Sequence, residues 1–340
     1  MPAYGYKLSY FAGDFPTVAV QDVYAERLFA LDQQTEAKVV SRFTPMPVPS
    51  GVKDQWFKMI NPIDGTTGRM DTVTSGLVAA IAAATAVSIQ EVTRRFEETQ
   101  LSYLTTKRRR MSTKQYRLAP FIERKDLKSE FCGIQQPVME ESVNAFNRKR
   151  DTICIAALDA DVTEATADTS TGADTETTVT FDEGCNTVDE DASEGLNVTK
   201  IRQGYKYWDE QEVDYIRERP VLIIGPSQKY QVSNDPLYNN RDYNPGANSQ
   251  TRELPTFVDA EIIVSNLLPQ DDSETYTDCF LYLPSAMLYC PEEEFYISIE
   301  KRADRNDGVQ ILQEHASGAL RLIDKRVQRI RCANALTEVS

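Results

Sequence analysis

One long amphipathic helix constrains the fold of this chain more than any other feature of its sequence. The pattern runs from Pro137 to Leu158, and proline suits the first turn of a helix because no amide hydrogen is needed there. Glu140 and Glu141 stand near the start and Arg148–Arg150 further along, an order that the helix dipole favours. Apolar residues recur every three or four positions, which predicts one apolar stripe on a helix of about six turns. The stripe contains Met139, Val143, Phe146, Ile153 and Ala157.

The segments before this helix predict an arm and a projecting hairpin. Residues 1–50 hold one helical pattern between Val23 and Val39, with irregular sequence around it and three prolines in PMPVPS. Residues 51–118 begin with the strand-like GVKDQWFKMI and end with the strand-like, basic LSYLTTKRRRMSTKQYRL. Between these limbs lie the turn-forming NPIDGTTGR and an alanine-rich stretch, Leu77–Phe96, that could be helical. Two extended limbs with a long tip between them favour a hairpin that leaves the body.

The segment after the helix is acidic. Asp159 to Glu194 holds twelve acidic residues and no Lys or Arg, so we expect an exposed loop or hairpin and not core. Beyond it the pattern alternates between helices and strands, and Val309–Ile330 reads as two strands paired in a hairpin. The expected helices are Val198–Glu212 and Ser227–Val232, and the expected strands are Pro220–Ile224, Phe257–Val264, Cys279–Leu283 and Phe295–Ile299.

Charge and cysteine content exclude several classes of function. The formal net charge of -15 argues against a general nucleic-acid binder, which needs a basic surface. The six cysteines are scattered without a CxxC pair, so we expect reduced thiols and no zinc site. The N-terminus lacks the pattern of a secretory signal, and the longest apolar run, Leu77–Val87, is too short to cross a membrane. We therefore expect a soluble protein.

Catalytic motifs are almost absent. The single histidine, His315, lies in an expected strand, where a structural role is the more common one. NPIDGTTG, Asn61–Gly68, resembles the metal-binding signature of magnesium-dependent phosphomonoesterases of the inositol-monophosphatase type. Only Asp64 matches a ligand, because Asn61 replaces the first carboxylate, and these residues are also ordinary turn formers. We predict no catalytic, cofactor-binding or metal-binding residue, and the phosphatase stays an alternative.

Three basic clusters remain to be explained. In an acidic chain they favour contact with acidic surfaces of neighbouring subunits over contact with DNA. The candidate intersubunit residues are Arg94, Arg95, Arg108, Arg109, Arg110, Arg148 and Arg150.

Taken in order, the segments resemble the major capsid proteins of tailed bacteriophages with the Hong Kong 97 fold. The arm helix matches as LFALDQQTEAKV, the basic limb as TRRFEETQL and KRRRMSTKQYRLAPFIERKD, and the spine helix as AFNRKRDTICIAAL. Further matches are GLNVTKIRQGYKYWDEQEVD with RPVLIIGPSQ, the strand FVDAEIIVSNLLP, and GALRLIDKRVQRIRC at the end. Each signature alone is weak, but their order over about residues 20 to 335 is specific.

This resemblance implies an α+β fold with five parts. They are an N-terminal arm (1–50), an extended loop (51–118), a peripheral domain with the spine helix and an acidic insertion (119–195), an axial domain (196–297) and a return to the peripheral domain (298–340).

The resemblance also implies a non-enzymatic subunit without cofactors. Its first partner would be itself, in hexamers and pentamers of an icosahedral head shell, with scaffolding, portal and decoration proteins as further partners. The shell would enclose double-stranded DNA without sequence-specific binding, contact no membrane, and assemble in the host cytoplasm into the virion capsid. Another virion structural protein is the second alternative.

Overall fold

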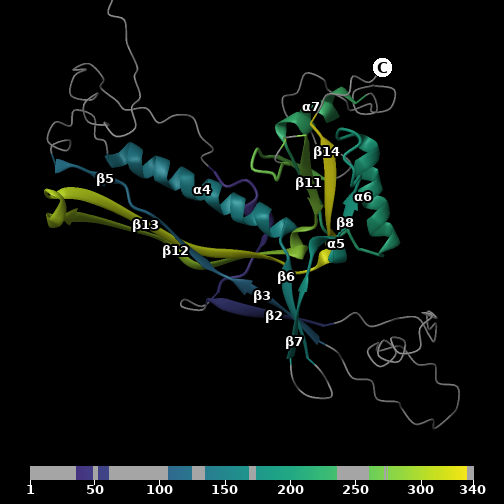
Figure 1. Cartoon of the computed structure of the whole chain (residues 1–340), viewed down its shortest axis with the longest axis horizontal. Helices are drawn as coiled ribbons and strands as arrows, with labels where there is room; N and C mark the ends of the chain where they lie inside the picture. The colour runs from purple at the N-terminus through teal and green to yellow at the C-terminus, as the bar shows by residue number, and fades with distance from the viewer. Residues whose placement is uncertain are drawn as a thin grey trace, which may run out of the picture.

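The computed structural model describes residues 36–48, 53–60, 106–124, 135–167, 174–235, 260–271, 273 and 275–334. Three sheets and one long helix, α4 (Gln135–Asp159), dominate this part of the chain (Figure 1). The first sheet has the order β1 (Thr44–Pro45), β12 (Met287–Arg302), β13 (Gly308–Arg321) and β4 (Lys114–Leu118), with β5 (Phe121–Ile122) also on β13. The second has the order β10 (Glu261–Val264), β9 (Val221–Ile224), β11 (Tyr276–Tyr282), β14 (Val327–Ala333) and β8 (Asn186–Val188). The third has the order β2 (Asp54–Ile60), β3 (Thr106–Ser112), β6 (Val162–Ala167) and β7 (Asp174–Val179).

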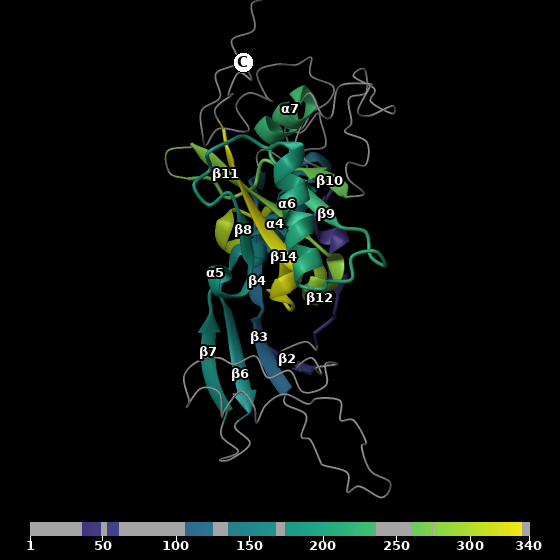
Figure 2. The same cartoon turned by 90° about the vertical axis from the view of Figure 1, so that its right-hand side faces the viewer.

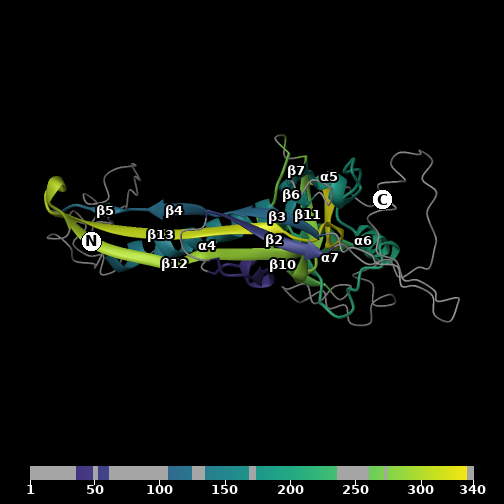
Figure 3. The same cartoon turned by 90° about the horizontal axis from the view of Figure 1, so that it is seen from below.

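Helix α4 lies along the long sheet of β12 and β13, as Figures 1 and 3 show. The predicted helix is confirmed, and in its predicted stripe Phe146 and Ala157 are buried and Met139 packs against a core cluster. Ser142, Phe146, Cys154 and Leu158 are buried, whereas Val143 is 37% exposed. Val143 is the member of the stripe that departs from the prediction, because it is turned away from the buried Ser142 by the helical step of about 100°.

The second sheet holds the main core. All four residues of β9 are buried, as are Cys279–Tyr282 of β11, so this sheet is covered on both faces. Helix α6 (Val198–Glu210) packs beside β14 and β8 and buries Trp208 completely, and α7 (Pro226–Asn234) lies at one end of the sheet (Figure 2). The strand expected at 220–224 and the helices expected at 198–212 and 227–232 are confirmed.

The predicted hairpin of Val309–Ile330 is wrong. Strand β13 pairs antiparallel with β12, and β14 pairs antiparallel with β11 and parallel with β8. The two limbs Tyr276–Arg302 and Gly308–Ala333 therefore form one long ribbon that runs through two sheets. Its limbs change sheet together, where Leu322 donates its amide N–H to Ala286 O. The expected boundary at residue 297 consequently falls inside β12, and β14 lies in the second sheet instead of returning to the sheet beside α4.

The third sheet confirms the two strands expected in the limbs of the extended loop. Strands β2 and β3 pair antiparallel, and β6 and β7 from the acidic segment extend the same sheet. The acidic segment is thus the expected hairpin, but it is not wholly exposed. Val162, Ala165, Phe181 and Val188 are buried, and Phe181 opens the short helix α5 (Phe181–Gly184). The buried residues are isolated apolar residues that stand between the carboxylates. The overall composition of the segment, which is acidic, did not predict that they would be buried.

Several predictions fall on residues that the structure does not describe. They are most of the arm helix of Val23–Val39, the NPIDGTTG motif, the alanine-rich Leu77–Phe96 stretch, and residues Arg94, Arg95 and Cys132. The five cysteines of the described segments are free thiols and buried. Within these segments, no helix combines the length and the apolar character that a membrane span needs.

Candidate subunit-contact site

The basic run of β3 is divided by the alternation of side chains along a strand. Lys107 and Arg109 lie on one face of the third sheet, and Arg108 and Arg110 lie on the other. Arg109 is 4% exposed, whereas Arg110 is exposed. The guanidinium of Arg108 lies 5.8 Å from the ring centroid of Trp56 on the neighbouring strand β2. The basic run of β3 therefore contains a buried arginine, Arg109, on one face of the sheet and an exposed arginine, Arg110, on the other.

Arg109 forms the centre of a buried junction of ion pairs. Its Nη2 lies 3.2 Å from Glu164 Oε2, and its Nη1 donates to Asp324 Oδ1 at 2.8 Å and to Arg321 O at 3.1 Å. Arg321 is fully buried, and its Nε donates to Asp324 Oδ1 at 2.8 Å while its Nη1 donates to Leu158 O at 2.8 Å. The junction thus joins β3 and β6 to the end of α4 and to the link between β13 and β14.

The charges of this junction stabilise one another. Burial acts to lower the pKa of Arg109, but hydrogen bonding and charge attraction from Asp324 and Glu164 leave that pKa raised. Burial acts to raise the pKa of Asp324, but Arg109 and Arg321 leave it lowered. The predicted intersubunit role of Arg109 is therefore revised, because its guanidinium is used inside its own subunit.

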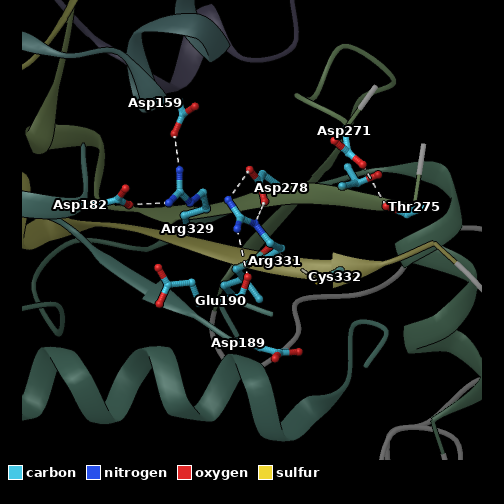
Figure 4. Close-up of polar contacts among 12 residues, drawn as sticks. Asp159, Asp182, Asp189, Glu190, Asp271, Thr275, Asp278, Arg329, Arg331 and Cys332 are labelled. Atoms are coloured by element: carbon cyan, nitrogen blue, oxygen red, sulfur yellow. Dashed lines mark hydrogen bonds and ion pairs between the residues drawn. The ribbon is translucent and has the colours of Figure 1, made fainter. Parts of the chain in front are cut away.

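A second group of ion pairs ties β14 to the acidic segment (Figure 4). Arg329 donates from Nη1 to Asp159 Oδ1 at 3.0 Å and from Nη2 to Asp182 Oδ1 at 2.5 Å. Two residues further on, Arg331 donates from Nε to Asp278 Oδ1 at 2.9 Å and from Nη1 to Glu190 O at 3.0 Å. Sequence reasoning missed these two arginines. Their alternate spacing in VQRIRC and the acidic segment without Lys or Arg were the available signals.

A third polar contact fixes the end of the N-terminal arm to α4. Asp151 is 1% exposed, and its carboxylate accepts hydrogen bonds from the amides of Lys38 (2.9 Å), Val39 (2.9 Å) and Val40 (3.3 Å). These amides lead into a short 3-10 turn, Val40–Arg42. The carboxylate serves them as a side-chain cap serves the first amides of a helix.

The remaining candidates on α4 face different surroundings. Arg150 donates from Nε to His315 Nε2 at 3.1 Å, and the same ring nitrogen lies 3.0 Å from Tyr289 Oη. His315 is 2% exposed, which agrees with the structural role expected for it. Arg148 is half-buried on α4. Of the candidates that the structure describes, Arg110 is the only exposed one and Arg109 the only buried one.

In the described segments, no group of three or more His, Cys, Asp or Glu side chains could hold a metal ion. Asp64, the residue on which the phosphatase alternative depends, lies outside them.

Acid is expected to weaken the subunit through Asp324 and Asp189. Burial acts to raise the pKa of Asp189, but hydrogen bonds from Lys200, Ser193 and the amide of Glu194 lower it to about 2. A lowered folded-state pKa contributes stability that is present above the unfolded value of about 3.9 and is lost as pH falls through the folded value. The melting temperature should therefore fall between about pH 4 and pH 2. Asp189→Asn should make that fall shallower, and an equally steep fall in the variant would contradict the assignment.

A family model described as phage capsid protein matches residues 66–334. A capsid protein of the cyanophage P-SCSP1u has a TM-score of 0.64 at 13% identity, over 96% of this chain and 93% of that one. A chain of Mycobacterium phage Che8 has a TM-score of 0.61 at 10% identity, over 89% and 94%. The capsid of Ralstonia phage GP4 gives 0.60 at 11% identity, over 92% and 95%. No curated protein sequence matches.

Proposed function

Because this chain belongs to the phage capsid protein family and has the Hong Kong 97-type capsid fold, we propose that it is the major capsid protein of a tailed bacteriophage. Its function is to build the icosahedral head shell of the virion. The family is one of structural proteins, which suggests a non-enzymatic role. Neither the family match nor the fold supports the phosphatase alternative.

One structural observation supports a shell subunit in particular. The long sheet projects from the second sheet, with α4 along one of its faces (Figure 1). Among the described residues, large apolar side chains stay exposed on this layer: Leu118, Phe121, Val143, Tyr296, Ile297 and Ile299. A thin layer of this kind gains its remaining burial from neighbours, and permanent interfaces bury about 2,000 Å² or more.

The finer features of the function follow from the same proposal. The subunits form hexamers and pentamers through repeated contacts that close into a shell. Scaffolding, portal and decoration proteins are the further partners, and the head assembles in the host cytoplasm and encloses double-stranded DNA. The net charge of -15 suits a wall that encloses DNA without binding it tightly.

The proposal is tested by the assembly state of the purified chain, expressed alone or with its scaffold. Size-exclusion chromatography with light scattering should find rings, tubes or shells in equilibrium with small oligomers. A monomer that persists under every condition, scaffold included, would count against a capsid subunit.

Arg110 is expected to affect assembly but not folding. The Arg110→Ala variant removes an exposed side chain, so its free energy of unfolding should stay within about 0.5 kcal/mol of the unaltered chain. If Arg110 meets a carboxylate of a neighbouring subunit, the concentration needed for assembly should rise and its salt dependence should weaken. Lys114→Ala, an exposed change on β4, is the control. Equal yields and equal salt dependence in all three proteins would make Arg110 a solvated charge.

A further inference from the structure

Among the described residues, the outer edge of β12 has a strand partner over only part of its length. The segment that contains β1 pairs with Leu288 and Tyr289, and its last hydrogen bond to β12 runs from Val48 N to Pro291 O. Bulges then interrupt the pairing of β12 with β13 between Pro291 and Tyr296. From Tyr296 to Arg302 the register with β13 is regular again, and no described residue pairs with the other side of this segment.

The direction of the backbone groups along this edge follows from the neighbouring strand. The amide of Ile311 donates to Pro120 O, on the side of β13 that faces away from β12. Ile311 stands directly opposite Ile299 of β12. In an antiparallel ladder such a pair exchanges no hydrogen bonds, so the N–H and C=O of Ile299 point to the open edge. The same holds for Ile297 and Lys301, two residues away on either side.

An open edge with exposed apolar side chains is a surface that most proteins protect. Here Ile299 is 53% exposed, Ile297 is 40% exposed and Tyr296 is 50% exposed. Ile297 and Ile299 lie on the face of the sheet that carries α4, because Ile311 packs with Val138 and Met139 of that helix. Such an edge fits a strand that adds to it through backbone hydrogen bonds.

We propose that Tyr296–Arg302 pairs antiparallel with the same segment of a second copy of this chain, across a twofold axis at Ile299. This inference rests on the proposed function and identifies one of its intersubunit contacts. The regular segment has seven residues and Ile299 is its midpoint, so an axis there uses the whole edge between the bulge and the hairpin tip. Three pairs then exchange backbone hydrogen bonds: Ile299 with Ile299, and Ile297 with Lys301 in both directions.

The side chains of this register complement one another. Tyr296 faces Arg302 of the second copy, an aromatic ring opposite a guanidinium. Ser298 faces Glu300, which already accepts the Ser298 hydroxyl of its own chain at 3.1 Å, so the pairing would let that hydroxyl donate to either copy. Ile297 faces the apolar stem of Lys301 of the second copy, and Ile299 faces Ile299 of the second copy. The register places no two like charges opposite each other, whereas an axis one residue further on would pair Glu300 with Glu300.

The experiment uses assembled particles that carry a cysteine at the proposed axis. In Ile299→Cys the two Cα atoms should lie about 5.5 Å apart, within the range that a disulfide spans. Mild oxidation should convert most subunits to dimers on non-reducing gels. Ser298→Cys is the matched control, since its diagonal separation of about 7–8 Å is too long and its side chain lies on the other face. The unaltered chain controls for its own thiols, of which the described ones are buried.

A second variant covers the case in which Ile299→Cys does not assemble. Ile297→Cys combined with Lys301→Cys should form dimers, while each single change should not. Particles that assemble normally but give no dimer in either design would overturn the twofold contact and leave the capsid function standing. Failure of the unaltered chain to form particles would instead contradict the proposed function. Cross-linking of Ser298→Cys as strongly as Ile299→Cys would contradict the register.

Discussion

Replacing Arg109 by alanine should strongly destabilise the subunit. The change removes the cation that Glu164, 5% exposed, shares with the largely buried Asp324. Among the described cations, Glu164 then keeps only the half-exposed Lys107, and Asp324 keeps only Arg321. Breaking a buried ion pair from one side costs about 3–5 kcal/mol, a large part of the roughly 5–15 kcal/mol that stabilises a typical domain. Urea unfolding followed by circular dichroism measures the loss.

The neighbouring arginine provides the control for this prediction. Arg110→Ala changes the same kind of side chain one position along β3, on the opposite face of the sheet. It should unfold at nearly the urea concentration of the unaltered chain. A stability of Arg109→Ala equal to that of Arg110→Ala would show that the junction contributes nothing. Replacing Arg108, Arg109 and Arg110 together would change folding and assembly at once, so that the two effects could not be separated.

Replacing Asp151 by alanine should release the end of the N-terminal arm from α4. Three backbone amides lose their acceptor, and each buried unsatisfied group costs about 1–3 kcal/mol. We expect a loss of at least about 2 kcal/mol and a failure of assembly, since residues 38–40 would no longer be held against α4. Asp151→Asn keeps one acceptor oxygen and should lose less.

Limited trypsin digestion reports the release directly, because Lys38 and Arg42 stand in the anchored segment. In Asp151→Ala, cleavage after these residues should become faster by an order of magnitude or more. Asp161→Ala, an exposed acidic residue just beyond α4, is the control. Unchanged cleavage in Asp151→Ala would contradict the anchor.

Local patterns predicted most of the elements, whereas long-range pairing was not predictable. The helices at 137–158 and 198–212 and the strand at 220–224 have periodic apolar residues within one short segment, and all three are present. The partners of β13 and β14 depend on β12 and β11, which lie before a turn at Ala303–Asp307. Within Val309–Ile330, the sequence pattern would be the same whether β13 paired with β14 or with the earlier strand β12.

The candidate site was predictable only in part, for a similar reason. The basic run of β3 was identified from charge, but the burial of Arg109 depends on Glu164 and Asp324, which are 55 and 215 residues away along the chain. Alternation along the strand would have separated Arg109 from Arg110. Arg329 and Arg331 show the same alternation and the same dependence on distant carboxylates.

Electron cryo-microscopy of particles assembled from the purified chain tests the central claim most directly. We expect closed shells whose wall contains this subunit, with α4 and the long sheet of β12 and β13 lying in the wall. Closed shells in which α4 and the long sheet lie outside the wall, or no particles under conditions in which the folded subunit and its scaffold are both present, would contradict the capsid function.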